Sequence, residues 1–454
     1  SDPWVKTYDA SLGWGPAYAK PSSPNWGSKV GFWGMKLAQD IVTNHQMPVC
    51  IINGAVGGTR IDQHQPNPVD RTQAGSLYGI YANLLNRVIA ARLNHGIRGV
   101  FWHQGESDCS NFGPILDYDY TTYEQNFLNM SASWKQDYPN FQRYVIFQVM
   151  PKPCGIGPKG DELREVLRTL PRLFSRMSIT NTLAIAGYEG CHFSRAGYES
   201  MANRLTPVVS RDFYGVASGP VTAPNLKRAY FANAARTSIA LEFDQAMSWS
   251  SFALPNYYVD KAGGKVTSGS ASGNIVTLQL SSAAAATATI DYLKDDFWNS
   301  NESVSTLLHG SNAIPALTFA DMMIGPPPTP YEVVGSLARA GEHNHAAFGR
   351  WRGGSAEGHG QAPAIRPAQH RPGIVTGVSA RLAEQAATGG QHIVGVAVHN
   401  IEPIFPSAQV VVVFSAPDIV QFIGVRVGVP YCGQHGAGAD QEGGGRITHI
   451  HLDG

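Results

Sequence analysis

The chain has 454 residues, a formal net charge of zero and 43% hydrophobic residues. Because one core of ordinary size closes near about 200 residues, this length predicts more than one domain. The balanced charge gives no electrostatic basis for binding nucleic acid or a membrane surface, and no uninterrupted apolar run of about 18 residues predicts a membrane span.

Residues 1–216 alternate between strand and helix patterns. Short apolar runs bounded by glycine and polar residues predict buried strands, and apolar residues spaced three and four apart predict helices. The expected strands are 49–53, 97–102, 144–150 and 183–186, and the expected helices are 32–43, 77–93, 120–138, 161–177 and 195–211. This alternation predicts an α/β domain with a mostly parallel sheet.

The strand at 49–53 ends in a glycine-rich segment, Asn-Gly-Ala-Val-Gly-Gly-Thr at residues 53–59. Gly57 and Gly58 would let backbone N–H groups approach a ligand closely, as an oxyanion site requires, although a plain tight turn also uses paired glycines. Arg60 comes directly after this segment. It could meet a carboxylate of the substrate, or it could be an ordinary exposed arginine.

The strand at 97–102 runs into Phe-Trp-His-Gln-Gly-Glu-Ser-Asp at residues 101–108. Polar groups at the carboxyl end of a buried strand are where open α/β sheets place ligand sites. The alternative is a strand end whose acids only hold a turn. Glu106 and Asp108 are expected to order this loop, and Glu106 could instead orient a catalytic histidine.

A third segment, Tyr-Glu-Gly-Cys-His-Phe-Ser at residues 188–194, places His192 on a loop before a helix. Ser194 has the residue type of an N-cap for that helix. A single histidine in such a place is often incidental. Glu189, three positions earlier, is within range to orient the imidazole, which makes His192 a candidate general base.

In this order the three segments resemble the sialate O-acetylesterase-like group of the SGNH hydrolases, which are carbohydrate acetylesterases, over residues 1–216. The resemblance implies a flavodoxin-like parallel sheet with helices on both faces, a nucleophilic serine, a histidine base and an oxyanion hole. It implies that His192 is the base, with Glu189 where the family usually has aspartate. The implied oxyanion donors are Gly57, Gly58 and the side chain of Gln104. No metal or other cofactor is implied.

The implied reaction is the release of acetate from O-acetylated sugars of the sialate type, with Arg60 and Trp102 as candidate substrate-binding residues. The expected partner is therefore an O-acetylated carbohydrate. Members of the family are often exported, which implies a secreted or periplasmic protein, in which one disulfide could join two of Cys109, Cys154 and Cys191. The competing hypothesis is a non-catalytic carbohydrate-binding or scaffold protein.

The sequence departs from the family at the nucleophile, because the family serine lies in a Gly-Gln-Ser-Asn segment after the first strand and no Gly-Gln-Ser occurs here. The early serines lie in a stretch without a strand signal: Ser1, Ser11, Ser22, Ser23 and Ser28. We therefore expect the first strand and its serine to be missing by truncation, and ester hydrolysis to be impaired. The centre of the sheet, between 49–53 and 97–102, should hold a gap or a substitute segment. The late apolar run 410–414 is the candidate for a substitute, but we do not expect it to take that place.

From residue 217 the pattern changes to short runs of period two, such as 238–243 and 275–280, separated by turns such as 262–264. This pattern predicts a small antiparallel β-sandwich over residues 217–325. Such a domain could bind sugar, or it could simply pack against the hydrolase.

Residues 326–454 begin with a stiff Pro-rich linker at 326–330 and continue as sequence rich in Gly, Ala, Arg and His. The histidines are scattered without the spacing of metal ligands. The runs 410–414 and 425–429 could form strands. The remainder lacks periodicity and is expected to be low-complexity, largely disordered sequence.

Overall fold

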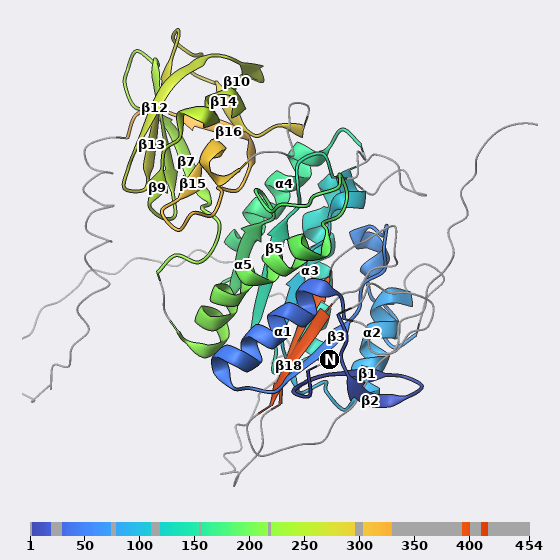
Figure 1. The fold of residues 1–454 in the computed structure, drawn as a ribbon. Coiled ribbons are helices and arrows are strands. Elements are labelled where there is room, and N and C mark those ends of the chain that lie inside the picture. The colour runs from blue at the N-terminus through green and yellow to red at the C-terminus, as the bar shows by residue number, and fades with distance from the viewer. Residues whose placement is uncertain are drawn as a thin grey trace, which may run out of the picture.

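The computed structural model describes residues 2–19, 30–73, 79–109, 119–153, 157–216, 219–295 and 303–328, and the backbone of 393–399 and 410–415. Within these ranges an α/β domain holds one eight-stranded sheet, and a β-domain (residues 219–328) holds another together with a two-stranded sheet. Figure 1 shows the helices gathered around the first sheet, with the β-domain at one end. None of the described helices combines the length and the apolar character that crossing a membrane needs.

The α/β domain is built on a mostly parallel sheet. Its strands are β1 (Val5–Asp9), β2 (Gly13–Pro16), β3 (Val49–Asn53), β4 (Ile97–Trp102), β5 (Arg143–Gln148), β6 (Met177–Asn181), β17 (Ile393–His399) and β18 (Val410–Ser415). Their order across the sheet is β2-β1-β3-β18-β17-β4-β5-β6, and the neighbours β4, β5 and β6 are parallel. The predicted α/β architecture is confirmed.

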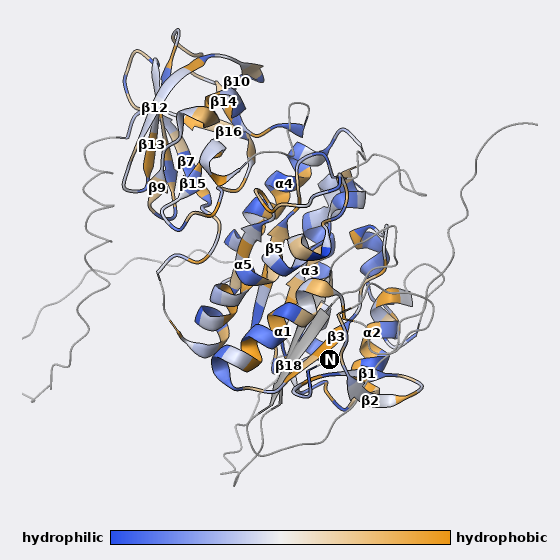
Figure 2. Ribbon diagram, in the orientation of Figure 1, coloured by the Kyte–Doolittle hydropathy of each residue, from blue (hydrophilic) through white to orange (hydrophobic). Residues whose placement is uncertain are grey.

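Helices cover both faces of this sheet. The helices α1 (Phe32–His45) and α5 (Arg195–Tyr214) pack on one face. The other face carries α2 (Gly79–Ala90), α3 (Tyr120–Asp137) and α4 (Gly160–Thr169). Because both faces are covered, β3 and β5 are buried along almost their whole length, and Figure 2 shows both as predominantly hydrophobic.

The amino-terminal stretch, which we expected to be loop, forms a hairpin at the edge of the sheet. Strand β1 pairs antiparallel with β2 and parallel with β3. Val5, Thr7 and Asp9 are buried and alternate with the less buried Lys6 and Tyr8, which is the period-two pattern of a half-covered strand. Only one of the three buried residues is aliphatic, so the stretch gives no apolar signal in the sequence.

The centre of the sheet is filled rather than open. Strand β17 runs parallel to β3 and to β4, with Val398 opposite Asn53 of β3 and His399 opposite Trp102 of β4. Strand β18 runs antiparallel to β17 and to β3. These strands pair backbone groups that would otherwise stay unsatisfied between β3 and β4. A substitute therefore takes the central position, and the expectation that 410–414 would not supply it is wrong. The rest of 331–454 lies outside the described residues.

The segment after β5 also differs from its prediction. Helix α4 ends at Thr169 and continues only as the 3-10 turn η4 (Leu170–Arg172), because Pro171 has no backbone N–H to continue the helical hydrogen bonds. The strand that follows is β6, at Met177–Asn181 and not at 183–186. Strand β6 contains Ser, Thr and Asn and so has no continuous apolar run. The prediction therefore placed the strand at the apolar residues 183–186 instead.

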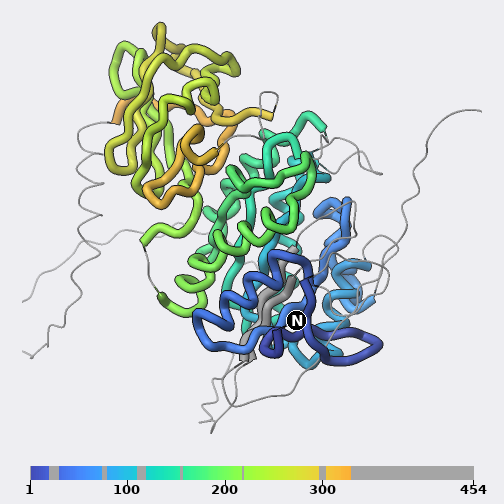
Figure 3. Tube along the Cα trace, in the orientation of Figure 1, coloured from blue at the N-terminus to red at the C-terminus, as the bar shows by residue number. Residues whose placement is uncertain are grey.

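The β-domain is a mostly-sheet unit whose strands pair antiparallel, except for β16 and β7, which pair parallel. Its strands are β7 (Leu226–Phe231), β8 (Ser238–Phe243), β9 (Met247–Ser248), β10 (Tyr257–Val259), β11 (Ala262–Gly263), β12 (Val266–Ser272), β13 (Ile275–Leu280), β14 (Thr289–Tyr292), β15 (His309–Gly310) and β16 (Phe319–Gly325). They follow the order β11-β10-β14-β16-β7-β8-β13-β12, while β9 pairs with β15. Leu241, Val276 and Tyr292 belong to one shared core. Figure 3 follows the chain from α5 into this domain.

Three cysteines lie among the described residues. Cys50 in β3 and Cys109 in the 3-10 helix η2 (Glu106–Cys109) are free and buried. Cys191 is disulfide-bonded, to a partner outside the described residues. The expected disulfide therefore includes Cys191 but not Cys109, and Cys154 lies outside the described residues.

Candidate active site

The three motifs follow β3, β4 and β6, so they lie at the carboxyl edge of the parallel strands. The first two motifs are brought into direct contact. Gln104 Nε2 donates to the carbonyl of Thr59 at 3.1 Å, and the backbone N–H of Ile61 donates to the Asp108 carboxyl group at 3.2 Å. The loop after β3 and the loop after β4 therefore form one hydrogen-bonded unit.

Gln104 is fully buried inside this unit. Besides its bond to Thr59, its Nε2 donates to the Asp108 carboxyl group at 2.5 Å, and its Oε1 lies 2.9 Å from the Tyr123 hydroxyl. Both amide protons are therefore committed to groups inside the protein. This geometry does not support the predicted role of Gln104 as an oxyanion donor, because its side chain holds the two loops together instead.

Tyr123 of α3 is a site residue that the sequence did not reveal. Its hydroxyl accepts from Trp102 Nε1 at 2.9 Å and lies beside the amide oxygen of Gln104. Burial raises the pKa of this hydroxyl well above its usual range, so it stays protonated and able to donate. A tyrosine inside a helix with apolar periodicity is typical of core, and nothing in the sequence marks it further.

Asp108 ties the 3-10 helix η1 (Ile61–His64) to η2, which is an arrangement that orders the loop. Burial raises the pKa of Asp108 to about 8, although the hydrogen bonds from Gln104 and Ile61 favour the ionised form. A carboxyl group with this pKa is mostly protonated at neutral pH. It is buried too deeply to act on a substrate directly, with only 1% of its surface exposed.

Glu106 lies on the same loop and is also buried. Its Oε1 is 3.6 Å from His103 Nε2, and its Oε2 has no hydrogen-bond partner among the described residues. A buried carboxylate oxygen without a partner is costly, which is typical of a position that a ligand or a further group completes. The histidine that it pairs with is His103, and its alternative role of orienting His192 stays a prediction.

Arg60 is buried rather than exposed. Its Nε and Nη2 donate to the two carboxylate oxygens of Asp62 at 2.8 Å and 2.7 Å. Next to this pair, the Thr59 hydroxyl lies 2.8 Å from His64 Nε2. The guanidinium is therefore already engaged by a bidentate partner, so the predicted contact with a substrate carboxylate would require that pair to open.

Trp102 lies in the hydrophobic core and does not line the site. None of its surface is exposed, and its indole ring contacts the rings of His64, Phe127 and Trp134. A sugar cannot stack on a ring that is enclosed on all sides. The expectation that Trp102 binds substrate is therefore corrected, because the strand end where it lies still faces the covered side of the sheet.

The glycine pair lies at the surface of the same edge. Gly58 is exposed, and its φ of 68° is in the left-handed region that favours glycine. The space around its Cα is open, since a Cβ added there would meet no atom within 4 Å. The backbone of Gly57 and Gly58 is thus accessible to a ligand, and their role as oxyanion donors stays a prediction.

The loop that carries His192 is folded by its own backbone. Glu189 N–H donates to the His192 carbonyl at 2.6 Å, and Ser194 N–H donates to the Gly187 carbonyl at 2.7 Å. Gly187 has a φ of 80°, and an added Cβ would lie 2.2 Å from the Ser194 hydroxyl oxygen. Ser194 caps α5 as predicted, by accepting from Gly197 N–H at 3.3 Å.

The imidazole of His192 is mostly buried. It is 9% exposed, and its Nε2 is buried without a hydrogen-bond partner among the described residues. Burial lowers the pKa of His192, and the charge of Glu189 partly opposes this effect. A neutral imidazole with an unengaged nitrogen can accept a proton, which is what a general base requires.

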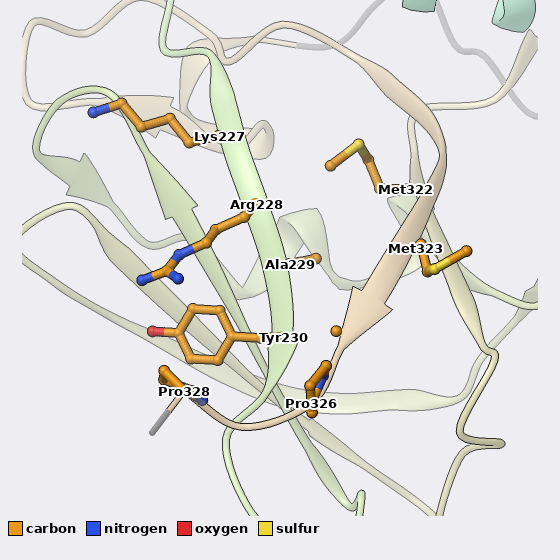
Figure 4. A pocket seen from close by; sticks show the side chains of 9 residues that line it. Lys227, Arg228, Ala229, Tyr230, Met322, Met323, Pro326 and Pro328 are labelled. Atoms are coloured by element: carbon orange, nitrogen blue, oxygen red, sulfur yellow. The ribbon is translucent and has the colours of Figure 1, made fainter. Parts of the chain in front are cut away.

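A hollow of 310 Å³ lies elsewhere, between β7 and β16 of the β-domain. Figure 4 shows Arg228 and Tyr230 projecting from β7, with the guanidinium carbon 5.1 Å from the centre of the tyrosine ring. The lining residues are Lys227, Arg228, Ala229, Tyr230, Met322, Met323, Gly325, Pro326 and Pro328. None of them belongs to the three motifs. The described residues contain no group of three or more His, Cys, Asp or Glu that could hold a metal ion.

Comparison with known proteins gives two matches of direct relevance. Residues 2–209, just under half of the chain, match the family model of carbohydrate esterases described as sialic acid-specific acetylesterases. The structure is similar to the crystal structure of a carbohydrate acetylesterase from Xanthomonas citri, with a TM-score of 0.52 and 18% identity, covering 70% of this chain and 73% of that chain. At this identity the likeness establishes the fold. No curated protein matches.

Proposed function

We propose that this protein hydrolyses acetyl esters on a carbohydrate, from the premise that residues 2–209 belong to the sialic acid-specific acetylesterase family of carbohydrate esterases. The three motifs predicted this family, and the fold is that of a known carbohydrate acetylesterase. The observation that carries the proposal is the Nε2 of His192 at the carboxyl edge of the sheet, which is buried and has no hydrogen-bond partner within the part of the chain that the structure describes.

His192 acts as the base in this proposal. Its Nε2 takes the proton of a serine hydroxyl while the serine oxygen attacks the acetyl carbonyl carbon. The imidazolium returns that proton to the sugar oxygen as the ester C–O bond breaks. Water, activated by the same imidazole, then hydrolyses the acetyl-serine and releases acetate. The backbone N–H groups of Gly57 and Gly58 hold the oxyanion in both steps.

The attacking serine decides how active the chain is. Among the described residues, no hydroxyl forms a hydrogen bond with His192 Nε2. Ser194, which is near in sequence, uses its hydroxyl oxygen as the cap of α5. We therefore propose that the chain hydrolyses esters slowly, as expected for a base and oxyanion donors without an attacking group in place.

We further propose a location outside the cytoplasm and a sialate-type substrate. The disulfide of Cys191 supports the location, because such bonds persist mainly in oxidising compartments. The family description supports the sialate substrate. Since Arg60 is engaged by Asp62, a carboxylate on the sugar would need a different cation, or hydrogen-bond donors such as backbone N–H groups.

The test compares the chain with its His192→Ala variant. Acetate release from 4-nitrophenyl acetate and from O-acetylated sialic acid measures turnover, and a fluorophosphonate probe followed by peptide mapping identifies any activated serine. We expect slow turnover that His192→Ala removes, with one serine labelled in a His192-dependent way. Turnover that does not depend on His192 would contradict the proposal.

The alternative is a non-catalytic carbohydrate-binding protein, which the hollow between β7 and β16 favours. Tyr230 offers an aromatic face there, next to the guanidinium of Arg228. Binding of oligosaccharides that Tyr230→Ala removes, in the absence of any acetate release, would support this alternative over the esterase.

A further inference from the structure

The β-domain reaches the edge of the candidate site through helix α4. Arg164 on α4 is almost completely buried, with 1% of its side chain exposed. Its Nε donates to Thr318 Oγ1 at 2.9 Å, and its Nη1 donates to the carboxylate of Asp295. Both partners belong to the β-domain. Asp161, on α4 itself, accepts from Nη2 at 2.6 Å and completes the buried cluster.

The same β-domain residues also hold the loop after β5. Gln148, the last residue of β5, donates to the Thr318 carbonyl at 2.9 Å and accepts from the Thr318 N–H at 2.8 Å. Asp295 Oδ1 accepts from the backbone N–H of Lys152 at 2.6 Å. Two residues of the β-domain therefore fix a loop at the carboxyl edge of the α/β sheet at separate points.

Helix α4 contacts both the β-domain and the motif after β4, so the β-domain also restricts the position of that motif. The N–H of Lys159, just before α4, donates to the Cys109 carbonyl at 2.9 Å. A Cβ added to Gly105 would lie 3.0 Å from Leu163 Cδ2 of α4. On the other side of the helix, a Cβ added to Gly160 would lie 1.9 Å from Asp295 Oδ2. Because Gly105 and Gly160 have no Cβ, α4 can pack closely against both neighbours, which leaves it little room to shift.

The buried thiol of Cys109 lies within reach of the charges of Arg164 and Asp295. The thiol of Cys109 in η2 is fully buried, and burial raises its pKa well above the usual range. The charges of Arg164 and Asp295 act on this thiol in opposite directions, together with those of Glu106 and Asp108. The Asp295 cluster is thus within electrostatic reach of the loop that bears the motif residues.

We infer that Asp295 is a positioning residue for the esterase site, because it locks α4 and the loop after β5, and through them residues 104–109. The β-domain then helps to set the geometry of the site and is not structurally independent of it. This inference rests on the proposed function only for the claim that the positioned loops serve ester hydrolysis. The mechanical coupling between the domains can be tested without any turnover.

The test uses the two buried free cysteines as reporters. Alkylation of the native protein by iodoacetamide, followed by peptide mapping, gives separate rates for Cys109 in η2 and Cys50 in β3. Asp295→Ala is expected to raise the rate at Cys109 by about tenfold or more and leave Cys50 within about twofold, because local opening exposes one region only. An unchanged rate at Cys109, or an equal rise at both cysteines, would overturn the inference.

Asp291→Asn is the matched control. Asp291 is a fully buried acid of the same domain, and it accepts from the backbone N–H of Asp321 and pairs with Lys261, neither of which lies on α4. This variant should leave the rate at Cys109 within about twofold of the parent. If Asp295→Ala does not fold, Thr318→Val removes only the hydroxyl bonded to Arg164. A selective rise at Cys109 is still expected, and its absence overturns the inference.

An activity measurement separates positioning from general stability. Asp295→Asn is expected to lower kcat for 4-nitrophenyl acetate by about tenfold with KM nearly unchanged, since a displaced loop impairs transition-state contacts more than binding of a small ester. Asp291→Asn should leave kcat as it is. A parent chain without turnover would count against the proposed function alone, because the cysteine rates would still decide the coupling.

Discussion

The loop after β4 and the loop before α5 differ in how fully their polar groups are buried and hydrogen-bonded. In the first, Gln104 and Asp108 are buried and have hydrogen-bond partners throughout. In the second, Glu189 is exposed and the Nε2 of His192 has no partner among the described residues. Polar residues that satisfy one another inside a protein hold its structure, whereas an unsatisfied group at an edge is available for chemistry.

This difference bears on the role of residues 101–108, the most distinctive of the three motifs. The segment 101–108 supplied much of the evidence for an active site, but six of its side chains lie inside the protein: Phe101, Trp102, His103, Gln104, Glu106 and Asp108. Their hydrogen bonds join the loops after β3 and β4, and so place the Gly57–Gly58 turn at the edge. The motif acts mainly as a scaffold for the site, and within it Glu106 has a buried oxygen, Oε2, with no hydrogen-bond partner among the residues that the structure describes.

Removing Gln104 and His192 separately tests whether the two loops contribute differently to stability. Gln104→Ala is expected to lower the free energy of unfolding by about 3 kcal/mol, because it leaves Asp108 and Thr59 O without their buried partner. His192→Ala is expected to lower it by about 1 kcal/mol or less, while removing any turnover. Urea unfolding of both variants measures the difference. Equal losses of stability would mean that the two loops do not differ as described.

The second prediction concerns the pH dependence of stability through Asp108. Its pKa is 3.8 before burial and about 8 in the folded protein. Between these values the folded state binds the proton and the unfolded state does not, so stability should fall as pH rises from 4 to 8. Asp108→Asn cannot titrate and should reduce this slope by at least about 1 kcal/mol over the range. Parallel stability profiles for parent and variant would show that Asp108 ionises normally.

The smallest expected effect concerns Glu189. Burial lowers the pKa of His192 and the charge of Glu189 raises it, so Glu189→Gln should lower that pKa further. The acidic limb of the kcat/KM profile should then move to lower pH by a few tenths of a unit, about the effect of one exposed charge. An NMR titration of the His192 ring measures the same shift without turnover. A shift to higher pH would exclude Glu189 as a charge acting on the imidazole.

Local patterns in the sequence were enough to predict most of the α/β domain. The helix expected at 32–43 is α1 at Phe32–His45, and the one expected at 120–138 is α3 at Tyr120–Asp137. Strands β3 and β4 were equally clear, because buried parallel strands are continuous apolar runs. The three short motifs predicted the family whose model residues 2–209 match, since their order along the chain is itself distinctive.

Other elements were decided only by tertiary contacts. The β1–β2 hairpin and the polar strand β6 depend on neighbours that supply their hydrogen bonds, so their own residues carry little signal. The filling of the central position by β17 and β18 joins residues more than 300 positions apart, as in the pairing of Val412 with Ile51. Backbone groups at the middle of a sheet need partners, and which segment provides them is not a local property.

The roles of the site residues likewise depend partly on the local sequence and partly on tertiary contacts. The sequence determined which residue types gather at the carboxyl edge, because strand ends and loops can be read from the chain. It could not determine that the Gln104 amide faces inward, that Arg60 is held by Asp62, or that Asp295 of the β-domain reaches α4. Those facts depend on which side chains meet across the fold, and only the tertiary structure brings such partners together.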